Sequence, residues 1–172
     1  MKNKKWIIEV FIWSFVLAIV FSYATNIVAI HSNIILTSLL ILIVISIGII
    51  FDMIGAASLT SSEATFHAMN SQKVKGASIA IKLIKNNVKV SSICNDIIGD
   101  ICGIVSGGLG AMLAISLHSI SKIDLAIITI LISALISSLT VGGKALFKQI
   151  AIKNADKIIN ITARIIYFFR KK

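Results

Sequence analysis

Two aspartates four residues apart, Asp96 and Asp100, lie in a stretch of the chain that is otherwise strongly apolar. Residues at this spacing share one face of an α-helix, so both carboxylates would point the same way, with the carboxamide of Asn95 beside them. Carboxylate and amide oxygens suit a hard divalent cation such as Mg²⁺, whereas zinc and copper sites normally include His or Cys. This set of oxygen donors predicts a divalent-cation site.

Two hydroxyl groups lie near the end of another apolar segment. Ser58 and Ser62 are also four residues apart, so they would add hydroxyl oxygens to the same cavity. The predicted metal ligands are therefore Ser58, Ser62, Asn95, Asp96 and Asp100. In the alternative arrangement, the serines bond to carbonyls of their own helix and both aspartates face interfacial water. The residue types are compatible with either arrangement.

The remaining reactive side chains offer less chemistry. Glu63 and His67 are one helical turn apart, but two ligands do not make a metal site, and a surface ion pair is the simpler interpretation. Cys94 and Cys102 are two turns apart, roughly 12 Å along one helix, which is too far for a disulfide. The sequence has no CxxC, HExxH, P-loop or GxSxG motif. We expect no enzyme activity.

The apolar residues come in four long blocks, at 6–30, 34–57, 91–117 and 125–146. A helix of about 20 apolar residues crosses the hydrocarbon core of a bilayer. With 57% hydrophobic and 14% charged residues, the chain carries too little charge to cover a soluble domain. The basic start is also typical of a signal peptide, but the first block exceeds the usual apolar core of about 7–15 residues, and no clear cleavage site follows. We predict an all-α integral membrane protein with four transmembrane helices.

The segment at 58–90 has the pattern of an amphipathic helix with a basic face. Its apolar positions recur at helical spacing and its lysines every seven residues: Val74, Ala77, Ile81, Ile84 and Val88, and Lys75, Lys82 and Lys89. Gly76 and the run 70–72 would divide the segment into a juxtamembrane helical hairpin. The residues from 147 onward form a C-terminal amphipathic helix with the stripe Phe147, Ile150, Asn154, Ile158, Ile161 and Ile165. Both segments are suited to lying among lipid headgroups.

Lys and Arg are strongly biased to one side of the predicted membrane. Three lie before the first block, five in the 58–90 segment and eight at or after Lys144, whereas the connectors on the other side hold only Lys122. Positively charged connectors stay in the cytoplasm. We therefore expect a multi-pass protein of the cell membrane with both termini cytoplasmic. The net charge of +10 then indicates contact with anionic lipid, and no pattern of basic and aromatic residues indicates nucleic-acid binding.

Several segments are similar to one known family. Thr60-Ser61-Ser62-Glu63-Ala64 is similar to a Ser-x-Ser-Glu-Thr run, and Gly143-Lys144-Ala145-Leu146-Phe147-Lys148, with 151–156 after it, is similar to a Gly-Glu-x-x-Pro-Lys run. The basic hairpin at 66–90 is similar to juxtamembrane helices. Residues 94–100 are more loosely similar to a Gly- and Asn-rich helix, in which Asn95 or Asp100 would be the cation-facing residue. On these motifs, residues 34–172 resemble the transmembrane domain of the CNNM/CorB/CorC magnesium transporters.

The resemblance implies a small protein that binds or transports Mg²⁺, or a similar divalent cation, through a polar cavity open to the cytoplasm. It also implies a homodimer formed through the membrane helices, with which the seam of Gly99, Gly103 and Gly107 is compatible. Residues 1–33 would be an additional N-terminal helix with a short external turn, and 34–172 the transporter-like domain.

The chain also departs from the family. Lys144 stands in place of the family's glutamate and Phe147 in place of its proline, and we expect no cytoplasmic CBS domains. A lysine ammonium would occupy the space of a bound cation and repel an incoming one. These departures favour an alternative function, a non-transporting membrane module that regulates a partner transporter or binds anionic lipid.

Overall fold

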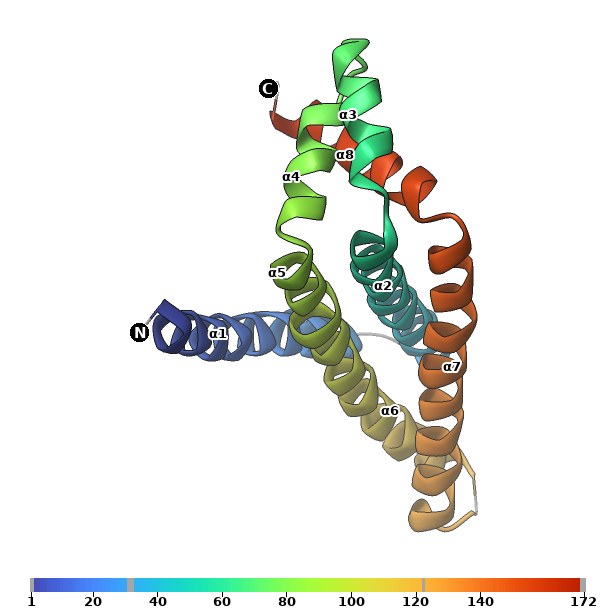
Figure 1. Cartoon of the computed structure of the whole chain (residues 1–172). Coiled ribbons are helices and arrows are strands. Elements are labelled where there is room, and N and C mark those ends of the chain that lie inside the picture. Colours follow the sequence, from blue (N-terminus) through green and yellow to red (C-terminus); the bar gives the residue numbers. More distant parts are fainter. Residues whose placement is uncertain (1, 31–32, 122, 171–172) are drawn as a thin grey trace. The chain divides into compact units, whose positions relative to one another are not determined.

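The computed structural model describes residues 2–30, 33–121 and 123–170, and their regular structure is entirely helical (Figure 1). In chain order the elements are α1 (Lys2–Ile30), α2 (Ile34–Thr60), α3 (Glu63–Ser71), α4 (Ala77–Lys85), α5 (Asn87–Ser91), the π-helical η1 (Ser92–Gly99), α6 (Asp100–Ile120), α7 (Leu125–Lys153) and α8 (Ala155–Arg170). The predicted all-α fold is confirmed. Lys122 and most of the predicted turn after the first helix lie outside the described residues.

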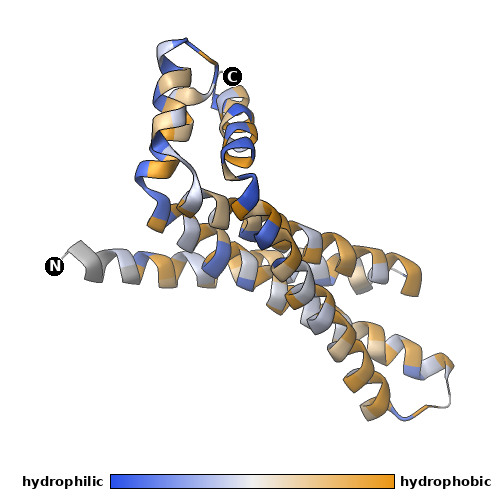
Figure 2. Cartoon of the chain, turned by 45° about the vertical axis from the view of Figure 1, so that its right-hand side comes forward, coloured by the Kyte–Doolittle hydropathy of each residue, from blue (hydrophilic) through white to orange (hydrophobic). Residues whose placement is uncertain are grey.

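Within the described residues, four helical segments are long and apolar enough to cross a membrane: Ile8–Ile27, Ile34–Thr60, Asn87–Ile120 and Leu125–Lys153. Ile and Val have modest helix propensity in water, but in a bilayer only a helix satisfies every backbone N–H and C=O of a single segment. Only 6% of the apolar stretch in α1 and 11% of that in α7 is buried by the rest of the chain. The remaining apolar side chains are exposed on the chain alone and are suited to contact with lipid. Figure 2 shows the hydrophobic colouring along α2, α6 and α7. The chain is a multi-pass membrane protein, as predicted.

The chain forms two compact units. Unit 1 consists of Met1–Ile49 and Ile97–Gly143, and unit 2 consists of Ile50–Asp96 and Lys144–Lys172. Both α2 and α7 contribute residues to both units. This division follows contacts in space, whereas the predicted boundary at residue 33 follows the family resemblance and stays a prediction.

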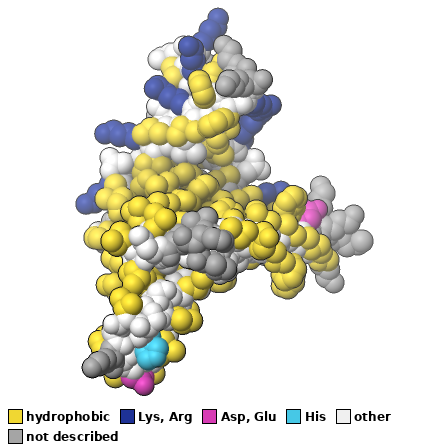
Figure 3. Space-filling view, turned by 180° about the vertical axis from the view of Figure 1, so that it is seen from behind, with side chains coloured by type: hydrophobic (Ala, Val, Ile, Leu, Met, Phe, Trp, Pro, Cys, Tyr) yellow, Lys and Arg dark blue, Asp and Glu magenta, His cyan; other side chains and the backbone are white. Residues whose placement is uncertain are grey.

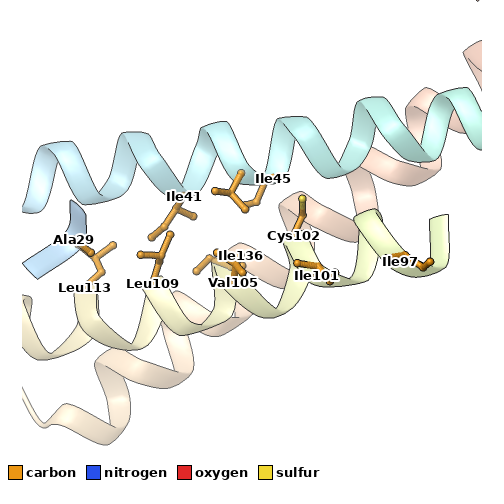
Figure 4. Close-up of a cluster of buried hydrophobic side chains, with 11 residues drawn as sticks. Ala29, Ile41, Ile45, Ile97, Ile101, Cys102, Val105, Leu109, Leu113 and Ile136 are labelled. Atoms are coloured by element: carbon orange, nitrogen blue, oxygen red, sulfur yellow. The ribbon is translucent and has the colours of Figure 1, made fainter. Parts of the chain in front are cut away.

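Unit 1 is held together by a row of apolar side chains between α2 and α6 (Figure 4). On α6 the buried residues Ile101, Val105, Leu109 and Leu113 recur every four residues, so they form one stripe. The stripe meets residues of the other helices, namely Ala29 of α1, Ile41, Val44 and Ile45 of α2, and Ile136 of α7. A Cβ added at Gly48 would lie 3.0 Å from Cβ of Cys102, so glycine allows α2 and α6 to approach closely.

Unit 2 is a small helical assembly of α3, α4, α5, the first part of η1, α8 and the adjoining ends of α2 and α7. Phe66 of α3 is fully buried, and much of its surroundings is alanine: Ala56, Ala57, Ala80, Ala151, Ala155 and Ala163, with Ile79, Ile84 and Ile159 completing the core. Small side chains let helix backbones come close together, and one large ring then fills the centre. The core is thus built more from alanine than from the stripes seen in the sequence.

Gly76 divides the 58–90 segment, as predicted. Its φ of 88° lies in the left-handed region, where glycine carries no steric penalty, and it immediately precedes α4. A Cβ at this position would also lie 3.2 Å from backbone atoms of Ala163, so α4 begins directly against α8. Of the predicted apolar positions, Ala77 and Ile84 are buried, whereas Val88 is exposed because the chain turns at Asn86 and continues as α5.

Candidate functional site

The predicted ligands are divided between the two units. Ser58, Ser62, Asn95 and Asp96 belong to unit 2, and Asp100, the first residue of α6, belongs to unit 1. Asn95 and Asp96 lie in η1, whose wider turn uses i→i+5 hydrogen bonds. Asp96 and Asp100 would share a face if the chain between them were α-helical. Because that segment is π-helical, the four-residue spacing does not by itself put both carboxylates on one face.

Asn95 packs against α2 at Gly55. A Cβ added at Gly55 would fall on Oδ1 of Asn95, so the missing side chain makes the room that the carboxamide occupies. The Nδ2 group of Asn95 donates a hydrogen bond of 3.3 Å to Oγ of Ser91. Oδ1 is buried, and it accepts no hydrogen bond from the described residues. A buried oxygen without a hydrogen bond lowers the stability of the fold by about 1–3 kcal/mol. A further hydrogen-bond donor or a cation at Oδ1 would therefore be stabilising.

Ser58 lies on the same turn of α2 and has no exposed surface. Its hydroxyl donates a hydrogen bond of 2.7 Å to the carbonyl oxygen of Gly55, which is the alternative arrangement considered for the serines. Gly55 therefore contacts both residues, through its carbonyl with Ser58 and through its Cα with Asn95. Ser58 and Asn95 thus have Gly55 as a common neighbour, and the Ser58 oxygen keeps lone pairs with which to accept.

Ser62 and Asp96 make separate contacts. Ser62 is exposed at the start of α3, and its backbone N–H, rather than its hydroxyl, takes part in a long-range hydrogen bond. Asp96 is exposed, and its Oδ2 accepts a hydrogen bond of 2.7 Å from the hydroxyl of Ser92. In the described part of the chain, no three His, Cys, Asp or Glu side chains come together as a metal cluster. A site in unit 2 would therefore depend on amide, hydroxyl and backbone oxygens.

Asp156 is a structural residue that the motif analysis did not single out. Its Oδ1 accepts the 2.9 Å hydrogen bond from the backbone N–H of Ser62, and this contact joins the start of α8 to the start of α3. The two residues also line a groove of about 380 Å³ with Thr60, Lys153, Asn154 and Lys157. An acid in the first turn of a helix is a recognisable pattern, because it complements the helix dipole. Nothing in the local sequence indicates its distant partner.

The predicted Glu63–His67 pair is present. Oε1 of Glu63 lies 3.0 Å from Nε2 of His67 and 3.5 Å from Nζ of Lys85, so the carboxylate also connects α3 with α4. The hydrogen bond from His67 has the largest effect and lowers the pKa of Glu63, partial desolvation raises it by less, and the nearby charge of Lys85 lowers it further. All three side chains are largely exposed, which suits a surface ion pair rather than a metal site.

Comparison with known proteins gives no match, whether to a family model, a curated protein or a solved structure. The resemblance to the magnesium transporters therefore depends on the quoted motifs alone. Lys144, where that family has glutamate, is half-buried in α7.

Proposed function

We propose that this multi-pass membrane protein binds a divalent cation in unit 2, where Asn95 meets α2, and that the cation is Mg²⁺. The observation that carries the proposal is the buried Oδ1 of Asn95, which accepts no hydrogen bond within the described chain. Ser58, three residues after Gly55 in α2, would supply a second oxygen. Asp96, the next residue after Asn95 in the sequence, stays a ligand predicted from sequence, because its carboxylate is exposed and accepts a hydrogen bond from Ser92. Neutral and anionic oxygens with retained waters are the ligands that Mg²⁺ prefers. Asp100, in the other unit, stays a ligand predicted from sequence.

A thermal-shift titration of the purified protein tests this proposal. MgCl₂ should raise the midpoint of unfolding more than a sodium salt of equal ionic strength, because a ligand that binds the folded state stabilises it. Asn95→Ala should abolish that difference. Asn160→Ala is a matched control, since Oδ1 of Asn160 is also buried without a hydrogen bond from the described residues but lies in α8. Equal Mg²⁺ protection of the Asn95 variant and the wild type would disprove the site.

The second candidate is a non-transporting module that regulates a partner transporter. It is favoured by the cation of Lys144 in a transporter-like motif, and by the Ser58 hydroxyl, whose proton is already bonded to Gly55. Reconstitution with a Mg²⁺-sensitive dye inside the vesicles separates the two candidates. Flux above that of empty vesicles supports a protein that binds and transports Mg²⁺, whereas no flux together with Mg²⁺-independent co-purification of a partner transporter supports the module.

A homodimer formed through unit 1 is the third part of the proposal. A Cβ added at Gly103 or Gly107 would meet no described atom within 4 Å. These glycines border a groove of about 260 Å³ that also contains Ser133, Ser137 and Thr140. Small residues on a membrane helix allow a second helix to approach closely. Gly107→Leu should reduce self-association in detergent, while Gly108→Leu, outside the groove, should not.

A further inference from the structure

Helix α8 has apolar side chains on two opposite faces. Ala155, Ile159 and Ala163 recur every four residues and are buried in the core of unit 2. Ile161, Ile165 and Phe168 lie on the other side, where they are 59%, 53% and 67% exposed. At about 100° per residue, these two sets are roughly half a turn apart. The core of unit 2 therefore accounts for only one of the two apolar faces.

Two exposed cations border this second face. Lys157 lies four residues before Ile161, and Arg164 lies three residues after Ile161 and four before Phe168. Both cations are therefore on the same side of the helix as the apolar row. We call the set Lys157, Ile161, Arg164, Ile165 and Phe168 the outer face of α8. The single acid of α8, Asp156, is half-buried and accepts a hydrogen bond from Ser62, and within the described residues it forms no ion pair with either cation. The outer face combines exposed apolar surface with positive charge.

The position of α8 in the chain brings it to a membrane surface. The candidate span in α7 ends at Lys153, and α8 begins at Ala155 after the single residue Asn154. A helix joined this closely to a transmembrane helix starts at the level of the headgroups. In Figure 3, Lys and Arg side chains gather over the region formed by α3, α4 and α8. Unit 2 carries 13 of the 17 Lys and Arg and only 4 of the 7 Asp and Glu.

We propose that the outer face of α8 docks on anionic phospholipid. Ile161, Ile165 and Phe168 enter the boundary between headgroups and acyl chains, while Lys157 and Arg164 extend to lipid phosphates. Charge complementarity selects this occupant. A second copy would bring another positively charged unit 2 to a face that already repels it, and a protein partner would have to supply acids for both cations. This surface is separate from the cation site proposed above.

Bromolipid quenching in vesicles tests the docking with the full chain. Phe168→Trp is the reporter, in a background with Trp6→Phe and Trp13→Phe, and Ile165→Trp is a second reporter on the same face. The vesicles contain equal amounts of phosphatidylglycerol and phosphatidylcholine, with only one of the two brominated on its acyl chains. We expect quenching of both reporters, and stronger quenching by the brominated anionic lipid. Gln72→Trp, in the exposed turn between α3 and α4, is the control and should not be quenched.

The charge contribution is measured with Lys157→Gln and Arg164→Gln together. Each cation near an anionic surface favours anionic lipid by about fivefold at low ionic strength, so the double variant should lose most of the preference of both reporters for the brominated anionic lipid. If neither brominated lipid quenches either reporter, the proposal is overturned. Quenching of the reporters by acrylamide would then show that the face is in water, and no quenching by acrylamide would show that a protein covers it. The proposal would also be overturned if the double variant kept the full preference of the wild type for the brominated anionic lipid.

Discussion

The backbone N–H of Ser62 donates a hydrogen bond of 2.9 Å to Oδ1 of Asp156, which is 94 residues further along the chain. This bond satisfies one of the unpaired N–H groups at the start of α3, and at the same time places a carboxylate at the start of α8. One side chain thus stabilises the beginnings of two helices in unit 2.

Asp156→Ala should destabilise unit 2 by about 1–2 kcal/mol, because it removes a charge-assisted hydrogen bond. Asp156→Asn is the matched control, since its carboxamide oxygen can still accept from Ser62 and only the charge is lost. The measurement is the midpoint of thermal unfolding in detergent. A shift as large for asparagine as for alanine would mean that the charge, rather than the hydrogen bond, stabilises the contact.

Gly55→Ala should destabilise the protein by about 1–3 kcal/mol, because the new methyl group would fall on Oδ1 of Asn95. The same variant should weaken Mg²⁺ protection if the proposed cation site is correct. Gly142→Ala, also within a helix, is the control: a Cβ there meets no described atom within 4 Å, so alanine should be neutral or stabilising. The measurement is the free energy of unfolding of both variants in denaturant. Equal values for Gly55→Ala and Gly142→Ala would show that Asn95 does not pack against Gly55.

The Glu63 ion pair should make stability depend on pH. In the folded protein its pKa is lowered from the ordinary 4.5, mainly by the hydrogen bond from His67 and also by Lys85. The carboxylate therefore stabilises the fold above the ordinary value, and this contribution is lost as the pH falls through the lowered pKa. Midpoints of unfolding for wild type and Glu63→Gln should differ at about pH 6 and converge as the pH falls below the lowered pKa of Glu63. A constant difference over this range would contradict the pairing.

The orientation in the membrane can be tested with cysteine labelling. In a background with Cys94→Ser and Cys102→Ser, Ser78→Cys in α4 should react with an impermeant maleimide only from the cytoplasmic side. Ile123→Cys, in the connector between α6 and α7, should react only from the opposite side. The reverse pattern would show that the charge bias of the connectors does not set the topology of this chain.

The sequence by itself determined the elements that depend on local composition. The length of the apolar blocks predicted the four membrane spans, because a helix needs about 20 apolar residues to cross the hydrocarbon core of a bilayer. Gly76 predicted the division of the 58–90 segment, because its left-handed conformation suits glycine. Four-residue spacing predicted the pair Glu63 and His67, because neighbouring turns of a helix bring such side chains into contact.

The tertiary structure decided everything that depends on residues distant in sequence. Periodicity placed Ile161 and Ile165 on one apolar stripe, but it could not show that the opposite face, with Ala155, Ile159 and Ala163, is the one buried in the core of unit 2. The π-helical turn at η1 changed the register between Asp96 and Asp100, which an α-helical pattern does not reveal. The contacts of Asn95 with Gly55 and of Asp156 with Ser62 join separate helices. Local propensity acts within a helix, whereas these contacts depend on how close two backbones come when the helices pack.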